Sequence, residues 1–158
     1  MGRPEMNFRQ AVAATPAIRD QLQNGLRAVR NVDRGRLRCS ATNRLRGSVD
    51  VDEALRAHCP NDPRWDYAIG MSYPREADHV VWLEVHPASS GHIAGIMGKL
   101  QWLKCWLATD AKALRQLRPH FCWVATRAIS FRRGGKEEKM IAQQGLRFPT
   151  KHLNLDEF

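Results

Sequence analysis

The fold is decided by residues 65–86, which read WDYAIGM (65–71), SYPREAD (72–78) and HVVWLEVH (79–86) in turn. The first and third pieces are rich in aromatic and β-branched residues, a composition that favours strands. The middle piece carries serine, proline and aspartate, which are turn formers. We therefore predict two strands that are joined by a turn and paired as antiparallel neighbours in one sheet.

Side chains alternate between the two faces of a strand, so the second strand gathers polar groups on one face. That face carries Val80, Trp82, Glu84 and His86. On the first strand, Asp66 shares its face with Ala68 and Gly70, whose small size predicts open space above the sheet. A carboxylate such as Glu84 in an apolar strand needs an exposed edge, an ionic partner or a metal ion, because burying an unpaired charge is costly.

Apolar periodicity and turn residues divide the rest of the chain into helices and strands. The predicted order is a helix at 16–30, a hairpin of 36–40 and 44–48, a short helix at 50–59, the two strands above, a long helix from Ser90, a helix at 110–118, a strand at 120–127, a helix at 136–144 and an extended segment at 146–155. This order is typical of an α/β protein with helices on the faces of a sheet.

The chain of 158 residues, with 43% hydrophobic residues, suits a single domain spanning 1–158 with its own core. Its apolar runs are far shorter than the roughly 18 residues that cross a bilayer, and residues 1–10 do not resemble a signal peptide. We therefore expect a cytoplasmic protein. The four cysteines form no C-x-x-C pair, which argues against a zinc ribbon and favours reduced thiols in the core.

Basic residues are concentrated toward the two ends of the chain. Residues 1–50 hold ten arginines and four acidic residues, residues 51–109 five basic and seven acidic, and residues 110–151 ten basic and three acidic. The net charge of +9 suits a nucleic-acid partner, because each cation that neutralises a phosphate releases a counterion. The alternative is that these side chains only solvate exposed faces. The predicted hairpin would form a compact basic surface of Arg36, Arg38, Arg44 and Arg46.

Across roughly residues 50–155 the chain resembles the restriction-endonuclease-like nucleases, the PD-(D/E)XK superfamily. That family carries an Asp near the start of one strand, (D/E)-x-K on the next strand, and then a helix and a further strand. Here Pro63-Arg-Trp-Asp66 is similar to a loosened PD, Glu84-Val85-His86 stands at (D/E)-x-K, and the helix from Ser90 follows. The resemblance implies a restriction-endonuclease-like α/β fold, a mixed central sheet flanked by helices. Residues 1–50 would be an arginine-rich helix and hairpin, and residues 51–158 the nuclease-like core.

By this resemblance Asp66 and Glu84 would ligate Mg²⁺ or Mn²⁺ near the backbone carbonyl of Val85, and Glu53 could supply an additional acid. His86 would be the third catalytic residue, in the place of the family's lysine and near the attacking water. Mg²⁺ prefers oxygen ligands, and a bound metal ion polarises a phosphodiester and activates water. The implied activity is metal-dependent hydrolysis of nucleic acid, with DNA favoured over RNA. A homodimer would supply the two active sites that duplex cleavage usually requires.

His86 is the departure from the family pattern. A neutral imidazole can act as a general base near pH 7 or bind a metal, but it does not supply a permanent positive charge. Some family members carry the lysine on the following helix. Measured from Ser90 at about 1.5 Å per residue, Lys99 lies roughly 13 Å and Lys104 roughly 21 Å along that helix, so we predict that neither replaces it easily. Lys104 falls within the apolar face, where its stem would pack.

Two alternatives to an active nuclease remain open. A catalytically inactive member of the same fold would bind nucleic acid or a protein partner without cleavage, and His86 favours that reading. In the other alternative the chain is an unrelated α/β protein whose basic surface binds an acidic partner. Asp66 would then cap a turn, Glu84 would pair with a nearby arginine, and His86 would simply end a strand.

Overall fold

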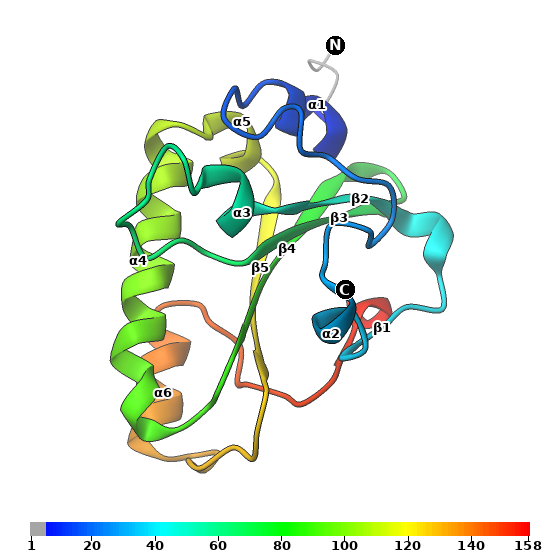
Figure 1. The fold of residues 1–158 in the computed structure, drawn as a ribbon. Helices are drawn as coiled ribbons and strands as arrows, with labels where there is room; N and C mark the ends of the chain where they lie inside the picture. The colour runs from blue at the N-terminus through cyan, green and yellow to red at the C-terminus, as the bar shows by residue number, and fades with distance from the viewer. Residues whose placement is uncertain (1–5) are drawn as a thin grey trace.

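The central sheet contains the two predicted strands and one further strand on each side of them. A computed structural model describes residues 6–158. The strands pair in the order β2-β3-β4-β5 and comprise Leu45–Asp50, Tyr67–Tyr73, Glu76–His86 and Arg118–Ala125 respectively (Figure 1). β3 is antiparallel to both β2 and β4, whereas β5 is parallel to β4, so the sheet is mixed. The prediction of two antiparallel neighbours is confirmed, and both lie in the interior of the sheet.

Short elements complete the architecture around this sheet. The helices are α1 (Phe8–Ala13), α2 (Asn31–Arg34), α3 (Val51–Leu55), α4 (Ile93–Thr109), α5 (Lys112–Arg115) and α6 (Lys136–Gln143). Single 3-10 turns cover Thr42–Arg44, Ser90–His92 and Leu155–Glu157. A separate two-stranded sheet joins β1 (Leu37–Arg38) to β6 (Leu153–Asn154) in parallel. None of the helices within residues 6–158 has the length and apolar character that crossing a membrane would require.

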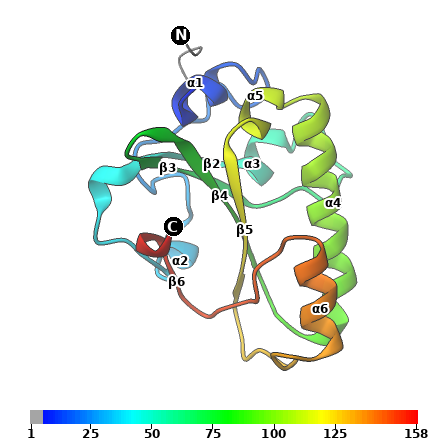
Figure 2. The same cartoon turned by 180° about the vertical axis from the view of Figure 1, so that it is seen from behind.

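The sheet separates two apolar layers, and the alternation predicted for β4 is confirmed. Val80 and Trp82 belong to the core on the side of α4, whereas Val81 and Leu83 belong to the second core cluster. Figures 1 and 2 show α4 and α6 along one face of the sheet and the small β1–β6 sheet with α2 on the other. The prediction of an α/β structure with a mixed sheet flanked by helices is therefore confirmed.

Helix α4 connects the two parallel strands and therefore runs back along β4. Its buried residues recur at helical spacing: Ile93, Ile96, Leu100, Leu103 and Leu107. This stripe packs on the sheet, as the apolar periodicity predicted. Because the chain leaves β4 at His86 and returns along the same face, positions inside α4 come to lie opposite positions inside β4.

The predicted helix at 16–30 is wrong. This segment consists of turns, with Gln23 forming an antiparallel bridge to Ser48 of β2 and Gly25 adopting a φ of +53°. The backbone N–H and C=O of Gln23 both bond to Ser48, at 2.9 Å each, so the segment meets its hydrogen-bonding requirement through the sheet edge. Its apolar residues are still partly or fully buried, which explains why their spacing imitated an amphipathic helix.

The predicted hairpin of 36–40 and 44–48 is also wrong, because its two halves join different sheets. Leu37 pairs with Leu153, whereas residues 45–50 form the edge strand β2 beside β3. The connection between them is held by Asp156, whose carboxylate accepts hydrogen bonds from the backbone N–H groups of Ser40 and Ala41. A partner more than 100 residues away therefore replaces the local pairing that the repeated pentads suggested.

Candidate active site

Three charged side chains from three elements meet on the α4 side of the sheet. Asp66 immediately precedes β3, Glu84 lies in β4, and Lys99 lies in α4. The Lys99 ammonium forms an ion pair with the Glu84 carboxylate and lies 4.0 Å from Oδ1 of Asp66. One ammonium thus faces both carboxylates, and we call Asp66, Glu84 and Lys99 the charged triad.

Reciprocal hydrogen bonds to the backbone fix the two carboxylates of the triad. The backbone N–H of Asp66 donates to Oε2 of Glu84 at 3.1 Å, and the backbone N–H of Val85 donates to Oδ2 of Asp66 at 2.9 Å. Each carboxylate is therefore oriented by a backbone N–H of the segment that carries the other one. Hydrogen bonds from N–H groups to charged acceptors are among the stronger ones in proteins, so the pair is preorganised.

The short helix predicted at 50–59 is present as α3 and supports Asp66 from the other side. The Asp66 carbonyl accepts hydrogen bonds from the N–H groups of Val51 (2.9 Å) and Asp52 (3.3 Å), and the Asp50 side chain caps the helix. Asp52 itself pairs with Arg64 at 3.0 Å. The turn before β3 is thus tied to the end of β2, which holds Asp66 at its place above the sheet.

Burial sets the electrostatics of the triad. The Glu84 side chain is 0% exposed, whereas Asp66 is 19% and Lys99 25% exposed, so solvent reaches the triad from the Asp66 and Lys99 side. Burial, followed by the charge of Asp66, raises the pKa of Glu84 well above its ordinary value. Burial also raises the pKa of Asp66, although Lys99 and the Val85 N–H oppose this. For Lys99, burial favours the neutral form, but the two carboxylates outweigh it and raise its pKa.

The space that the sequence predicted above Asp66, Ala68 and Gly70 is not open. The ring of Phe8 from α1 lies directly over Gly70, so closely that a Cβ at this position would overlap it. Lys99 fills the position beside Asp66. Glycine is required at position 70 for the approach of Phe8, and access to the carboxylates is restricted to the exposed margin of Lys99 and Asp66.

Two of the predicted site residues lie outside the triad. Glu53 is 62% exposed and pairs with Arg56 at 3.1 Å, because it stands on the solvent side of α3. His86 ends β4 with its ring Nδ1 3.0 Å from the Pro87 carbonyl and its ring edge-on to His92 at 4.8 Å. The structure therefore brings Asp66 and Glu84 together as predicted, but it places Lys99 beside them instead of Glu53 or His86.

The distance estimate that set Lys99 too far along its helix to reach the carboxylates is corrected by the structure, for two geometric reasons. The α-helix begins at Ile93, so Lys99 lies only about 9 Å along it, while Glu84 lies about 7 Å back along β4 from His86. A helical side chain also points toward the N-terminus of its helix, so the Lys99 ammonium lies nearer the start of α4 than the Lys99 Cα does, and this brings it to Glu84. Lys104, by contrast, donates to the Gln144 carbonyl at 2.6 Å, consistent with the structural role predicted for it.

The four arginines predicted to form one nucleic-acid-binding surface are engaged separately. Arg36 donates to the Ala125 carbonyl, and Arg46 lies 3.6 Å from Asp78. Arg44 donates to the carbonyls of Ser72 and Phe158 and lies over the Tyr73 ring. Arg38 is exposed on the small sheet. A hairpin would have aligned these side chains, but their two pentads belong to different sheets, so no hairpin aligns them.

The donor set of the triad suits a hard divalent cation with few protein ligands. Across the part of the chain that the structure describes, no three His, Cys, Asp or Glu side chains gather as a metal-binding group. Mg²⁺ commonly binds through one or two carboxylates and keeps several waters, so Asp66 and Glu84 fit this mode. Both already face a cationic group, Lys99, which shows that the position accepts positive charge.

All four cysteines are free, and only Cys122 is buried.

Comparisons with protein-family models, with curated proteins and with solved structures found no match to this chain.

Proposed function

We propose that the protein is a metal-dependent nuclease that hydrolyses phosphodiester bonds of DNA, with the charged triad as its active site. The observation that carries this proposal is the position of Lys99, whose ammonium faces both Asp66 and Glu84 from the neighbouring helix. The strand motif has His86 in place of the family's lysine, and in this proposal Lys99 of α4 supplies that lysine. Two acids and a lysine are the chemical groups that the resemblance to the PD-(D/E)XK superfamily implies.

The order of elements supports the same proposal. Asp66 precedes one strand, Glu84 lies on the antiparallel neighbour, and a long helix then leads to a parallel strand. This is the sequence of elements that the resemblance implies around the motif. We therefore propose the restriction-endonuclease-like fold as the finer description of the mixed sheet, with β2 to β5 and α4 as its core.

In the proposed reaction, Asp66 and Glu84 would hold Mg²⁺ or Mn²⁺. The bound ion supplies Lewis-acid polarisation of the phosphodiester and lowers the pKa of the attacking water. A water oxygen forms a new bond to phosphorus, one ester P–O bond breaks, and the proton released by the water balances the one taken up by the leaving oxygen.

Lys99 contributes a permanent cation to this chemistry. Its ammonium is partly exposed, so it can donate a hydrogen bond to a non-bridging phosphate oxygen while staying beside the carboxylates. Positive charge fixed at that position stabilises the negative charge that grows on the phosphate oxygens in the transition state. Because burial raises the pKa of Glu84, protons compete with the metal at low pH, and cleavage is expected to increase as the pH rises.

The test is cleavage of plasmid and end-labelled oligonucleotide DNA in millimolar Mg²⁺ or Mn²⁺, with EDTA as the metal-free reference. Glu84→Gln and Lys99→Met should each lower the cleavage rate by at least about a hundredfold. Lys104→Met removes the same charge from the same helix outside the triad and should cleave like the wild type. His86→Gln should also retain activity. Cleavage that persists in Glu84→Gln, with folding confirmed by circular dichroism, would refute the assignment of the site.

A second candidate is a catalytically inactive domain of the same fold that binds nucleic acid. The observation that favours it is the ion pair in which Lys99 already supplies a cation to the fully buried Glu84. It predicts salt-sensitive DNA binding with no cleavage under any metal, and no change in stability on addition of Mg²⁺ or Mn²⁺.

A further inference from the structure

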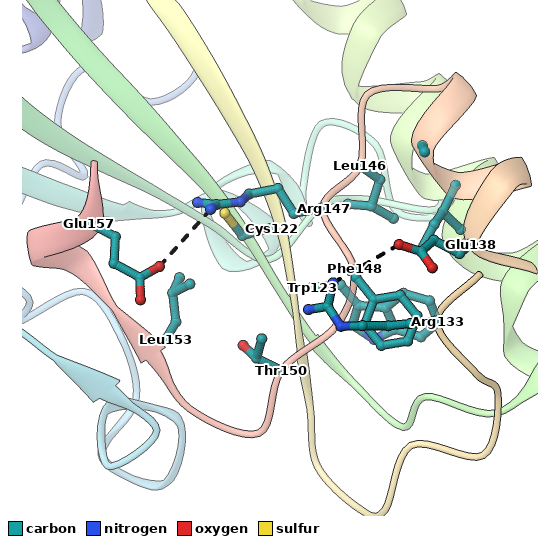
Figure 3. A pocket seen from close by; sticks show the side chains of 12 residues that line it. Cys122, Trp123, Arg133, Glu138, Leu146, Arg147, Phe148, Thr150, Leu153 and Glu157 are labelled. Atoms are coloured by element: carbon teal, nitrogen blue, oxygen red, sulfur yellow. Dashed lines mark ion pairs between the residues drawn. The ribbon is translucent and has the colours of Figure 1, made fainter. Parts of the chain in front are cut away.

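A cavity of about 450 Å³ lies at the outer edge of β5, between this strand and α6. Its lining combines aromatic rings with guanidinium groups, and Figure 3 shows Trp123, Phe148 and Arg133 together on one side with Arg147 and Thr150 nearby. Its volume lies within the range of sites that enclose small organic ligands. We call it the edge cavity.

Trp123 connects the edge cavity to the charged triad. It is the register partner of Glu84 on the neighbouring strand, and its indole N–H donates to the His86 carbonyl at 3.0 Å. Residues directly opposite in adjacent strands share one face of the sheet, about 4.8 Å apart. A ligand in the edge cavity therefore lies about one strand away from the triad, on the far side of Trp123.

Two guanidinium groups at the cavity are held by aromatic rings and leave hydrogen-bond donors unused. Arg133 lies over the ring of Phe148 at 4.5 Å, and Arg147 lies over the ring of Phe158 at 4.6 Å. Their ion pairs, with Glu138 and Glu157, are both 4.0 Å long, which is beyond hydrogen-bond distance (Figure 3). Such groups are preorganised for an anion, because an incoming phosphate offers closer contacts than the existing carboxylates do.

The loop at 126–135 extends this positive charge toward the end of β4, the strand that carries Glu84. Ser130 donates to the Ala88 carbonyl at 3.0 Å, and the buried ring of Phe131 packs against Trp123 and Phe148, so the loop is anchored beside the end of β4. The cationic residues of this loop are Arg127, Arg132 and Arg133, and Lys136 follows as the first residue of α6. Among the described residues, no carboxylate lies within 4.0 Å of Arg127, Arg132 or Lys136.

We propose that the edge cavity binds one nucleotide of a nucleic-acid strand, and that a phosphodiester further along the same strand lies at the charged triad. Arg133 and Arg147 bind the phosphates that flank this nucleotide, and the loop at 126–135 follows the backbone between the two places. A small anion can contact only one of these cations, whereas a linear polyanion can contact all of them. This inference rests on the proposed function for its orientation, and it replaces Arg36–Arg46 as the site of strand binding.

The test measures binding without cleavage. A fluorescently labelled single-stranded oligonucleotide is titrated with protein in EDTA, and anisotropy is followed between about 50 and 200 mM salt. Arg133→Gln with Arg147→Gln should weaken binding roughly tenfold and reduce the salt slope by about 1.4, which corresponds to two phosphate contacts on a single strand. The control, Arg19→Gln with Lys112→Gln, removes the same charge from exposed positions near α1 and α5, at the other end of the sheet, and should bind like the wild type.

A second variant tests the cavity itself and leaves the charge unchanged. Ala142→Trp, at an exposed position that lines the cavity, should weaken binding severalfold with an unchanged salt slope. Equal losses in the arginine pair and in its control, or wild-type affinity in both the arginine pair and Ala142→Trp, would overturn the inference and leave the nuclease proposal standing. If the arginine pair and Ala142→Trp lose affinity, the control does not, and the wild type never cleaves DNA, then the edge cavity is supported as a strand-binding site and the hydrolytic function is refuted. Absence of wild-type binding at low salt would overturn both.

Discussion

Replacing Lys99 with methionine tests the electrostatic account of the triad. Methionine keeps the unbranched stem but removes the ammonium that faces Glu84 and Asp66. Removing one partner of a buried ion pair costs about 3–5 kcal/mol, and the partial exposure of Lys99 reduces this to about 2–3 kcal/mol. Glu84 is fully buried, so it cannot recover its lost partner from water.

The loss of stability caused by Lys99→Met should depend on pH, in a direction that follows from the pKa of Glu84. Burial and Asp66 already raise the pKa of Glu84, and loss of the ammonium raises it further. A carboxyl group whose pKa is higher in the folded than in the unfolded protein contributes to the stability of the protein. That contribution is fully present below the ordinary pKa of about 4.5 and is lost as the pH rises through the pKa of the folded state. The destabilisation should therefore be smaller at pH 5 than at pH 8.

Urea denaturation at both pH values measures this difference. Lys99→Met with Glu84→Gln should recover most of the stability at pH 8, because a neutral amide needs no cation. Lys104→Met, which loses a hydrogen bond to the Gln144 carbonyl and a cation–π contact with Phe121 but no carboxylate partner, should show no such pH dependence. An equal loss at pH 5 and pH 8 in Lys99→Met, or no recovery in the double variant, would refute the reasoning.

Gly70→Ala should destabilise the protein by about 1–3 kcal/mol because its Cβ would overlap the ring of Phe8, whereas Gly98→Ala, which faces open space, should gain up to about 1 kcal/mol of helix stability. Thermal denaturation of the pair checks this, and equal effects would contradict it. Burial and then His79 lower the pKa of His120 to about 4, so this residue contributes stability that is lost as the pH falls from about 6.5 through 4. His120→Asn should flatten the stability profile in that window, and an unchanged slope would count against the assignment. Mg²⁺ should raise the melting temperature of the wild type but not of Asp66→Asn, and an equal shift in both would remove Asp66 from the proposed metal site.

The strand pair that carries Asp66 and Glu84 was predictable because its information is local. Aromatic and β-branched residues flank a turn, and the alternation within each strand fixes which side chains share a face. The same holds for α4, whose apolar stripe is a periodic property of its own residues. Short-range patterns therefore determined the centre of the sheet, the helix that covers it and two of the three residues of the triad.

The N-terminal third was mispredicted because its partners are distant in sequence. The spacing of apolar residues in 16–30 fits a helix, but the backbone of Gln23 bonds to Ser48 instead. The paired pentads suggest a hairpin, but Leu37 joins Leu153. In both places a segment of modest intrinsic preference adopts the structure that its tertiary neighbours offer, and no local signal specifies that neighbour.

By itself, the sequence determined the alternation that aims Glu84 and Asp66 to one side of a sheet, since that follows from the two-residue period of a strand. Only the tertiary structure decided which cation meets them. The return of α4 along β4 sets Lys99 opposite Glu84, and that placement depends on where the helix begins and how it crosses the sheet. Such distances arise from packing between elements, so a residue 15 positions away became the neighbour while His86, two positions away, did not.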